Sequence, residues 1–353
     1  MKVLFTCGRE LSYPRNQVML KALREICQVI EVTDETPSFI LRHSQLLLKL
    51  LWQSRRTYDL AFVGFYGHLL LPWLRMLSSK PLIFDAFLST YDTLCFDRKK
   101  FRPNSLPGKL AYWLDKYTCT IADTVLLDTQ THADYFVETF GVPRTKIHVI
   151  YLGCDEEVFH PSQKALSSHG DFVVLYYGSF LPLQGIEYII QAAKLLEGHK
   201  DIKFKIIGKG IEYRKIRHLA NVLQSSNIEF LPPVPYTELP LHIAQASLCL
   251  GGHFSSINKA HRVIASKTYQ FIAMAKPTIV GDNPANRELF THRENAYLCP
   301  MGNAEALASA ILELKENRPL RQRIAENGYR LFRERCTISK IVQSLKNIIE
   351  KLI

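Results

Sequence analysis

The residues best suited to chemistry lie between positions 248 and 282, where a basic loop joins an apolar run to a helix. The apolar run ends at Gly251-Gly252, and glycine allows a backbone to approach a ligand closely. Lys259 and Arg262 follow in the loop, and Lys267 falls in the first turn of the expected helix. A cation at that place opposes the helix dipole unless an anion binds there too, so the pattern indicates a phosphate site. A solvated surface lysine would give the same pattern.

The elements that would position this stretch repeat one plan, in which a buried strand ends at a glycine turn and a helix follows. One such strand ends at Gly178-Ser179 and another at Gly208-Lys209, so both turns can converge with the Lys267 helix on one phosphate-rich ligand. We expect strands at 172–177, 203–207, 228–231, 248–252, 278–280 and 296–299, and helices at 185–196, 237–246, 304–314 and from the N-cap Ser266 to Pro277.

The first half of the chain alternates strands and helices in the same way, which is typical of a doubly wound α/β domain. Its expected strands are 3–6, 29–32, 59–64, 81–85, 125–128 and 146–151, and its expected helices are 16–27, 39–52, 108–121 and 131–139. Ligands meet such sheets at the strand C-termini, so Gly8, Arg15, Asp85 and Asp92 are the candidates for this cleft. For Asp85 and Asp92, a role in capping a helix or ordering a loop is an equal alternative.

Length and charge restrict the classes of protein. The 353 residues exceed one ordinary domain, and the eight scattered cysteines show no metal or disulfide spacing, which fits a reducing compartment. The net charge of +11 is uneven, because residues 42–116 hold 12 Lys and Arg but only 5 Asp and no Glu. Such a bias favours an anionic partner, either a membrane surface, a phosphorylated acceptor or a nucleic acid, over a merely solvated basic face.

The basic region is also rich in apolar side chains, since the helix at 39–52 reads FILRHSQLLLKLLW and Trp73 follows. Basic residues beside Trp and Leu suit a protein that lies on a bilayer. A helix packed on a sheet would look alike, and we favour membrane contact slightly. No groove-reading motif accompanies the cations, so we expect no nucleic-acid partner.

Five segments taken in order resemble the GT-B glycosyltransferases, specifically their retaining family four. They are 121–155 (IADTVLL followed by IHVIYLGCD), 172–192 (FVVLYYGSFLPLQGIEYIIQA), 206–210 (IIGKG), 267–277 (KTYQFIAMAKP) and 294–308 (ENAYLCPMGNAEALA). The resemblance covers nearly the whole chain and implies two Rossmann-like domains facing a cleft. The domains would be 1–161 for the acceptor and 171–330 for the nucleotide sugar, with a linker at 162–170. C-terminal helices would follow at 331–353, the last of them packing back on the first domain.

The chain departs from the family's pattern at four positions. Two glutamates usual in the family are replaced by Arg262 and Gln270, and a usual Arg and Lys by Ser179 and Gln184. We therefore expect Arg262, with Lys259 and Lys267, to hold the donor diphosphate, because a guanidinium grips phosphate oxygens in a fork. The turn residues Gly178 and Ser179 would assist, and the nucleoside would contact Gly208, Lys209, Pro235 and Gln270.

The resemblance implies transfer of a sugar, with retention, from a nucleotide sugar to a lipid-linked or polysaccharide acceptor. Asp85, Arg262 and Lys267 are the residues that we expect to be catalytic. No D-x-D motif occurs, so we expect neither metal nor cofactor, with the protein itself neutralising the diphosphate. We expect a cytoplasmic protein that contacts the inner face of the cell membrane. A non-catalytic nucleotide-sugar-binding relative and a nucleotide-sugar 2-epimerase remain alternatives.

Overall fold

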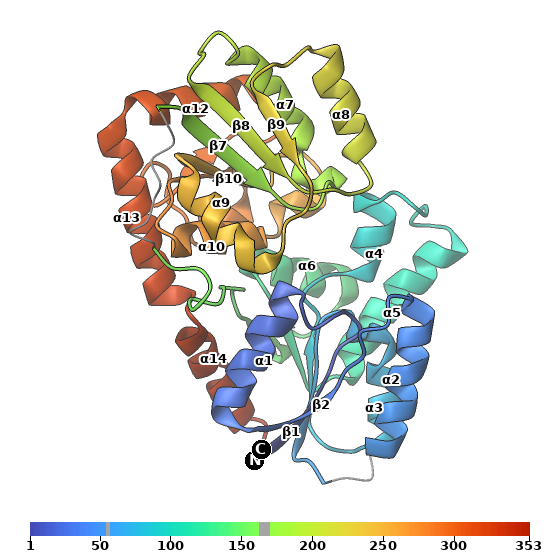
Figure 1. Cartoon of the computed structure of the whole chain (residues 1–353). Helices are drawn as coiled ribbons and strands as arrows, with labels where there is room; N and C mark the ends of the chain where they lie inside the picture. Colours follow the sequence, from blue (N-terminus) through green and yellow to red (C-terminus); the bar gives the residue numbers. More distant parts are fainter. Residues whose placement is uncertain (54–56, 162–169) are drawn as a thin grey trace. The chain divides into compact units, whose positions relative to one another are not determined.

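The computed structural model describes residues 1–53, 57–161 and 170–353, which divide into two compact units (Figure 1). Unit 1 comprises Met1–Leu152 and Ile338–Ile353, and unit 2 comprises Gly153–Thr337. The described part of each unit holds one six-stranded parallel sheet with helices around it, which confirms the predicted α/β class. The predicted linker at 162–170 lies, except for Gly170, outside the described residues.

The sheet of unit 1 has the order β2-β1-β3-β4-β5-β6. All residues of β3 and β5 are buried, as expected for parallel strands covered on both faces. The strands are β1 (Lys2–Thr6), β2 (Gln28–Val32), β3 (Leu60–Val63), β4 (Leu82–Asp85), β5 (Thr124–Leu127) and β6 (Ile147–Val149). The helices before residue 152 are α1 (Pro14–Ile26), α2 (Phe39–Gln53), α3 (Leu71–Leu77), α4 (Thr90–Asp92), α5 (Leu106–Ile121) and α6 (Gln130–Phe140).

The last helix, α14 (Ile338–Glu350), completes the core of unit 1. Its apolar residues recur every three or four positions and form one buried face that includes Ile341 and Leu345. This face packs against α1, whose Met19 and Leu23 belong to the same apolar cluster. Figure 1 shows α14 beside α1.

The boundaries of the units differ from those predicted, because residues 153–161 and 331–337 belong to unit 2. The cause is side-chain contact that the sequence pattern did not reveal. The Sγ of Cys154 donates to the Tyr269 carbonyl oxygen at 3.7 Å. The buried ring of Phe159 packs edge-on against Tyr236, with ring centroids 5.1 Å apart.

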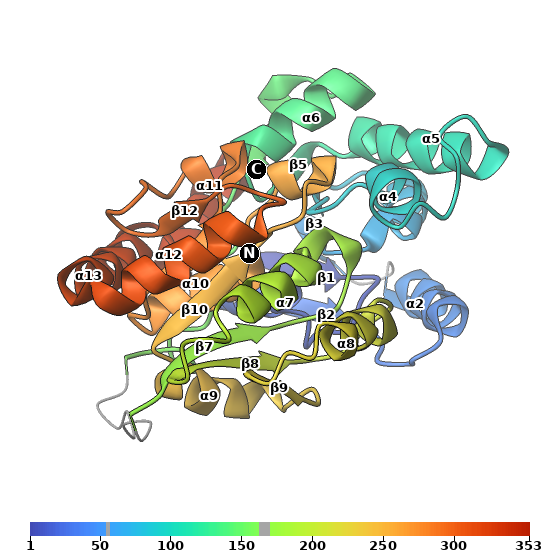
Figure 2. The same ribbon diagram turned by 90° about the horizontal axis from the view of Figure 1, so that it is seen from above.

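The sheet of unit 2 has the order β12-β11-β10-β7-β8-β9, and helices α7 and α8 cover one face of it while α9 lies on the other (Figure 2). Its strands are β7 (Phe172–Tyr177), β8 (Ile202–Ile207), β9 (Ile228–Leu231), β10 (Leu248–Gly252), β11 (Thr278–Gly281) and β12 (Tyr297–Cys299). Its helices are α7 (Ile186–Leu195), α8 (Tyr213–Val222), α9 (Leu239–Gln245), α10 (Ser266–Ala273), α11 (Pro284–Arg287), α12 (Ala304–Glu316) and α13 (Arg318–Arg335).

Two details of local structure complete the description. The N-cap of α10 is Ala265 rather than the predicted Ser266, and its side chain forms no cap hydrogen bond. In the part of the chain that the structure describes, the helices all fall short of the length and apolar character needed to cross a membrane.

Candidate functional site

The candidate site of unit 2 lies where the strand order reverses. Strands β7 and β10 are neighbours in the sheet, although β8 and β9 lie between them in the sequence. Parallel α/β sheets bind ligands outside the carboxyl ends of the strands at such a reversal. Gly178 follows β7, and β10 ends at Gly252. Helix α10 begins after the loop that leaves β10, so the predicted basic stretch reaches this edge.

Two glycine turns pack tightly together at this edge of the sheet. Gly208 has a φ of +137°, and a Cβ built on it would lie 2.1 Å from the carbonyl oxygen of Gly178. Gly178 itself has a φ of +147°, and a Cβ there would lie 3.1 Å from Cε of Lys267. Only glycine fits both constraints at these positions. The structure therefore brings Gly178, Gly208 and Lys267 together, as the sequence predicted.

Lys267 is a buried cation at this edge of the sheet. It is the second residue of α10, and its side chain is 5% exposed. Its ammonium donates to Oε1 of Gln184 at 2.7 Å and lies 4.8 Å from the centroid of the Tyr176 ring. Among the described residues no carboxylate pairs with it, and burial lowers the pKa of Lys267 to about 7. A desolvated cation without a counter-charge at a helix N-terminus is a position where an anion would be stabilised.

Two partners of Lys267 were not identified as site residues from the sequence. Gln184 was noted only as a departure from the family's pattern, yet its Oε1 also accepts from the Tyr176 hydroxyl at 3.2 Å. Tyr176 belongs to the apolar strand β7, where nothing in the sequence distinguishes it from a core residue. Its inward-facing ring is visible only in the structure, where the buried hydroxyl takes a hydrogen-bond partner.

His253, directly after β10, is a third residue that sequence reasoning did not select. The ring is 4% exposed, hydrogen-bonds the backbone of Val263, and has an Nδ1 without a partner among the described residues. Burial lowers the pKa of His253 to about 3, with further lowering by the charges of Lys267 and Lys259. The imidazole is therefore neutral, and both lysines lie within electrostatic reach of it.

The remaining predicted diphosphate residues occupy the loop before α10 and the turn after β7. Lys259 is buried at 8% exposure, Arg262 is half-buried, and Ser179 is exposed. The Arg262 backbone N–H donates to the Lys259 carbonyl oxygen at 3.1 Å, so the two residues share one turn. Their contact with a diphosphate stays a prediction.

The predicted nucleoside residues divide into buried and exposed members. Gln270 is 3% exposed, and its side chain hydrogen-bonds the Tyr236 hydroxyl. Lys209 and Pro235 are exposed, and the carbonyl oxygen of Lys209 accepts the backbone N–H of Phe180 at 2.9 Å. Their contact with a nucleoside stays a prediction.

The predicted catalytic role of Asp85 does not fit its surroundings in unit 1. Asp85 and Arg15 are both fully buried and form a two-pronged ion pair, with Arg15 Nη2 2.8 Å from Oδ1 and Nε 2.9 Å from Oδ2 of Asp85. The third arm of the guanidinium donates to the Ile150 carbonyl oxygen at 2.8 Å. Burial raises the pKa of Asp85, and the Arg15 charge opposes this effect. Neither side chain is open to a ligand, so the pair links α1 to the ends of β4 and β6.

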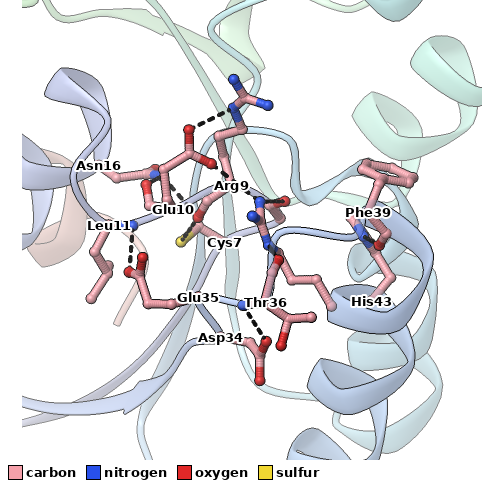
Figure 3. Close-up of polar contacts among 12 residues, drawn as sticks. Cys7, Arg9, Glu10, Leu11, Asn16, Asp34, Glu35, Thr36, Phe39 and His43 are labelled. Atoms are coloured by element: carbon pink, nitrogen blue, oxygen red, sulfur yellow. Dashed lines mark hydrogen bonds and ion pairs between the residues drawn. The ribbon is translucent and has the colours of Figure 1, made fainter.

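Polar contacts that include those of Arg9, Glu10 and Asn16 hold the loop after β1 (Figure 3). Gly8, another predicted cleft residue, belongs to this loop. Asn16 Nδ2 donates to the Glu10 carbonyl oxygen at 3.1 Å, and Arg42 Nη1 to Oε2 of Glu10 at 3.2 Å. A Cβ on Gly8 would lie 2.1 Å from the Tyr66 carbonyl oxygen, so glycine is required here for packing. Asp92 is 1% exposed at the end of α4 and presents no open carboxylate.

One further ionisable pair lies at the strand ends of unit 1. His132 Nδ1 and Asp128 Oδ1 are 2.7 Å apart, and both side chains are buried. The described residues contain no group of three or more His, Cys, Asp or Glu side chains that could hold a metal ion. Metal independence stays a prediction.

Two family models match the chain in succession. The model described as Glycosyltransferase Family 4 matches residues 3–158, and the model described as Glycosyl transferases group 1 matches residues 160–331. Together they span nearly all of both units.

Curated relatives are also glycosyltransferases by name. The chain is 26% identical over 250 residues to an uncharacterized glycosyltransferase of Methanocaldococcus jannaschii, a match that covers 70% of this chain and 64% of that protein. It is 24% identical over 180 residues to the lipopolysaccharide core biosynthesis glycosyltransferase LpsD of Rhizobium meliloti, covering 51% and 50% of the two chains. The matched region is thus less than two thirds of either relative.

Solved structures share the fold over the whole length. HepE of Anabaena in complex with UDP-glucose superposes with a TM-score of 0.78 at 18% identity, with 100% of both chains covered. Sucrose-phosphate synthase of Thermosynechococcus elongatus gives 0.78 at 14% identity, covering 100% and 99%. At such identities the likeness establishes the fold alone.

Proposed function

Because the chain belongs to the group 1 glycosyltransferases of the GT-B fold, we propose that it transfers a sugar from a nucleotide-sugar donor to a glycan or lipid-linked acceptor. The proposed transfer is of a hexosyl unit, proceeds with retention, and needs no metal ion. The acceptor class draws support from the relative named for lipopolysaccharide core biosynthesis.

The observation that supports donor binding best is the buried ammonium of Lys267, which pairs with no carboxylate among the described residues. It lies beside Gly178 and Gly252, since its Nζ would be 3.5 Å and 3.9 Å from a Cβ built on each glycine. These glycine backbones leave room for an oxyanion next to the cation. A bound diphosphate would restore the ordinary pKa of Lys267, because an opposite charge favours the protonated form.

In the proposed chemistry, the ammonium of Lys267 stabilises the leaving diphosphate. Negative charge gathers on the diphosphate as the bond to the anomeric carbon breaks, and preorganised donors lower the energy of that state. Lys267 and the positive end of the α10 dipole, where no side chain caps the helix, would supply this stabilisation. Lys259 and Arg262 would add charge from the preceding loop, and Gln184 would orient the ammonium of Lys267.

The test is a thermal-shift panel of nucleoside diphosphates, beginning with UDP because HepE has been crystallised with it. We expect one base to raise the melting temperature of the wild type, by about 2.7 kcal/mol of added stability at a hundredfold excess over Kd. Lys267→Met and Arg262→Ala should lose the shift. Lys276→Met is the control, because Lys276 donates to the Ala244 and Ala246 carbonyl oxygens, which precede β10 at its opposite end.

The outcomes separate the proposed transferase from its alternatives. A shift that persists in Lys267→Met would contradict the assignment of the diphosphate to this lysine. Donor binding without turnover on any acceptor would indicate a non-catalytic relative. Release of an epimerised or free sugar without an acceptor would indicate a 2-epimerase.

A further inference from the structure

Most of the large exposed apolar side chains in the described part of unit 1 lie on three helices. Leu106 is 82% exposed, Met76 78% and Ile40 75%, which are large values for residues that normally avoid water. The full set on α2, α3 and α5 comprises Phe39, Ile40, Leu41, Leu48, Leu51, Trp52, Trp73, Met76, Leu106, Leu110, Trp113 and Tyr117, hereafter the apolar face. Exposed apolar side chains that gather on neighbouring helices indicate an interaction site.

Helix α5 shows the pattern most clearly. Leu106, Leu110, Trp113 and Tyr117 are spaced by four, three and four residues, which places them on one side of the helix. This side points to solvent, since the residues are between 36% and 82% exposed, whereas Ala111, Asp115 and Thr118 are buried on the other side. The rings of Trp113 and Tyr117 stack in parallel at 4.8 Å. The helix therefore has a second apolar side that the fold of unit 1 does not use.

The three helices are neighbours. Helix α3 packs against both α2 and α5, and Figure 1 shows the three along the same side of unit 1. Their sequences hold a single acidic residue, Asp115, which is fully buried and accepts a hydrogen bond from Ser89. The exposed cations on α5 and on the segment before it are Arg98, Lys99, Lys100, Arg102, Lys109 and Lys116. Helices α2, α3 and α5 thus combine exposed Trp and Leu with positive charge, and their described residues include no exposed carboxylate.

We propose that the apolar face binds an anionic lipid surface, with Trp and Leu entering the interface and the cations contacting the headgroups. Amphipathic tryptophans settle at the boundary between headgroups and acyl chains, and Lys and Arg near an anionic leaflet add attraction. A second copy of this chain does not fit as the occupant, because two such faces would bring like charges together. This inference goes beyond glycosyl transfer, and its test requires no donor or acceptor.

Tryptophan fluorescence provides a direct test, because the three tryptophans of the chain, Trp52, Trp73 and Trp113, all belong to the apolar face. We expect a blue shift of emission when the full chain meets vesicles of phosphatidylcholine and phosphatidylglycerol, and a weaker one with phosphatidylcholine alone. Brominated acyl chains should quench the emission. An unchanged spectrum with anionic vesicles at low salt would overturn the proposal. A shift that follows protein concentration without vesicles would overturn it in favour of self-association.

A matched pair of variants distinguishes vesicle binding through the apolar face from nonspecific hydrophobic adsorption. Leu106→Glu with Leu110→Glu changes the apolar face and keeps every tryptophan. Val222→Glu with Leu241→Glu makes the same change at residues of unit 2 that are 64% and 65% exposed. In vesicle co-sedimentation we expect the first variant to lose about tenfold or more in partitioning and the second to stay within about twofold of the wild type. Equal losses, or an unaffected first variant, would contradict the assignment to this face.

Discussion

Each unit buries a cation at the second position of a helix, Arg15 in α1 and Lys267 in α10, and the two differ in what surrounds the charge. Arg15 meets both oxygens of Asp85 and a backbone carbonyl, so its charge is neutralised inside the protein. Lys267 meets an amide oxygen and an aromatic ring, with no carboxylate among the described residues.

The difference distinguishes a structural charge from a charge to which we assign a function by proposal. A buried ion pair whose hydrogen bonds are satisfied needs no other partner, and its two members fix each other's position. A buried cation with only neutral partners costs stability until an anion arrives. The sequence suggested Arg15 through its proximity to the strand ends and Lys267 through its place in the first turn of a helix, and neither feature reveals a counter-charge. The counter-charge is what distinguishes them.

Removing the counter-charge in unit 1 should have the largest effect. Asp85→Ala leaves the Arg15 guanidinium buried and unpaired, and we expect a loss of about 3–5 kcal/mol in the free energy of unfolding. The urea midpoint of unit 1 would report it. A loss below about 1 kcal/mol would show that the pair is not the structural element inferred here.

Removing the cation in unit 2 should act in the opposite direction. Lys267→Met replaces a desolvated ammonium by an apolar chain of similar length, and we expect a gain of about 2–4 kcal/mol. Differential scanning calorimetry without ligand should show a rise of roughly 4–16 °C in the melting temperature of unit 2. The same variant should lose about a hundredfold or more in kcat. A variant that is both less stable and active would remove the contrast between the two cations.

Two glycines sharpen the comparison, because a Cβ on either Gly8 or Gly208 would lie 2.1 Å from a backbone oxygen. We expect Gly8→Ala and Gly208→Ala each to cost about 1–3 kcal/mol through overpacking, measured by urea unfolding. Only Gly208→Ala should also weaken the response to nucleoside diphosphates. A response lost equally in Gly8→Ala would place that loop of unit 1 in the donor site.

The pH dependence of stability gives the smallest change at each step, one pH unit at a time. The pKa of Lys267 is lowered to about 7 in the folded protein, against about 10.4 for an unperturbed lysine. Between these values the unfolded chain binds one more proton than the folded chain, so the cost is complete below pH 7 and relieved as pH rises. The stability of wild type relative to Lys267→Met should therefore rise by about 1.4 kcal/mol per pH unit over this window. A flat difference from pH 7 to 10 would mean that Lys267 stays protonated.

The alternation of strands, glycine turns and helices was visible in the sequence, because period and turn chemistry are local properties. Lys267 could also be identified from the sequence, since its place in the first turn of a helix follows from the positions of Gly252 and Pro277. The structural role of Asp85 could not be identified from the sequence, because its partner Arg15 lies 70 residues away. Gln184 and Tyr176 were missed for the same reason, as their contacts with Lys267 join segments far apart in the chain.

The return of α14 to unit 1 has a consequence for synthesis of the protein. Unit 2 is continuous from Gly153 to Thr337, whereas unit 1 needs residues 338–353 to cover the apolar side of α1. During translation the first unit to begin is therefore the last to be completed. Until Ile338–Glu350 leaves the ribosome, Met19 and Leu23 lack their partner helix, and the nascent first unit is the part of the chain that chaperones would have to protect.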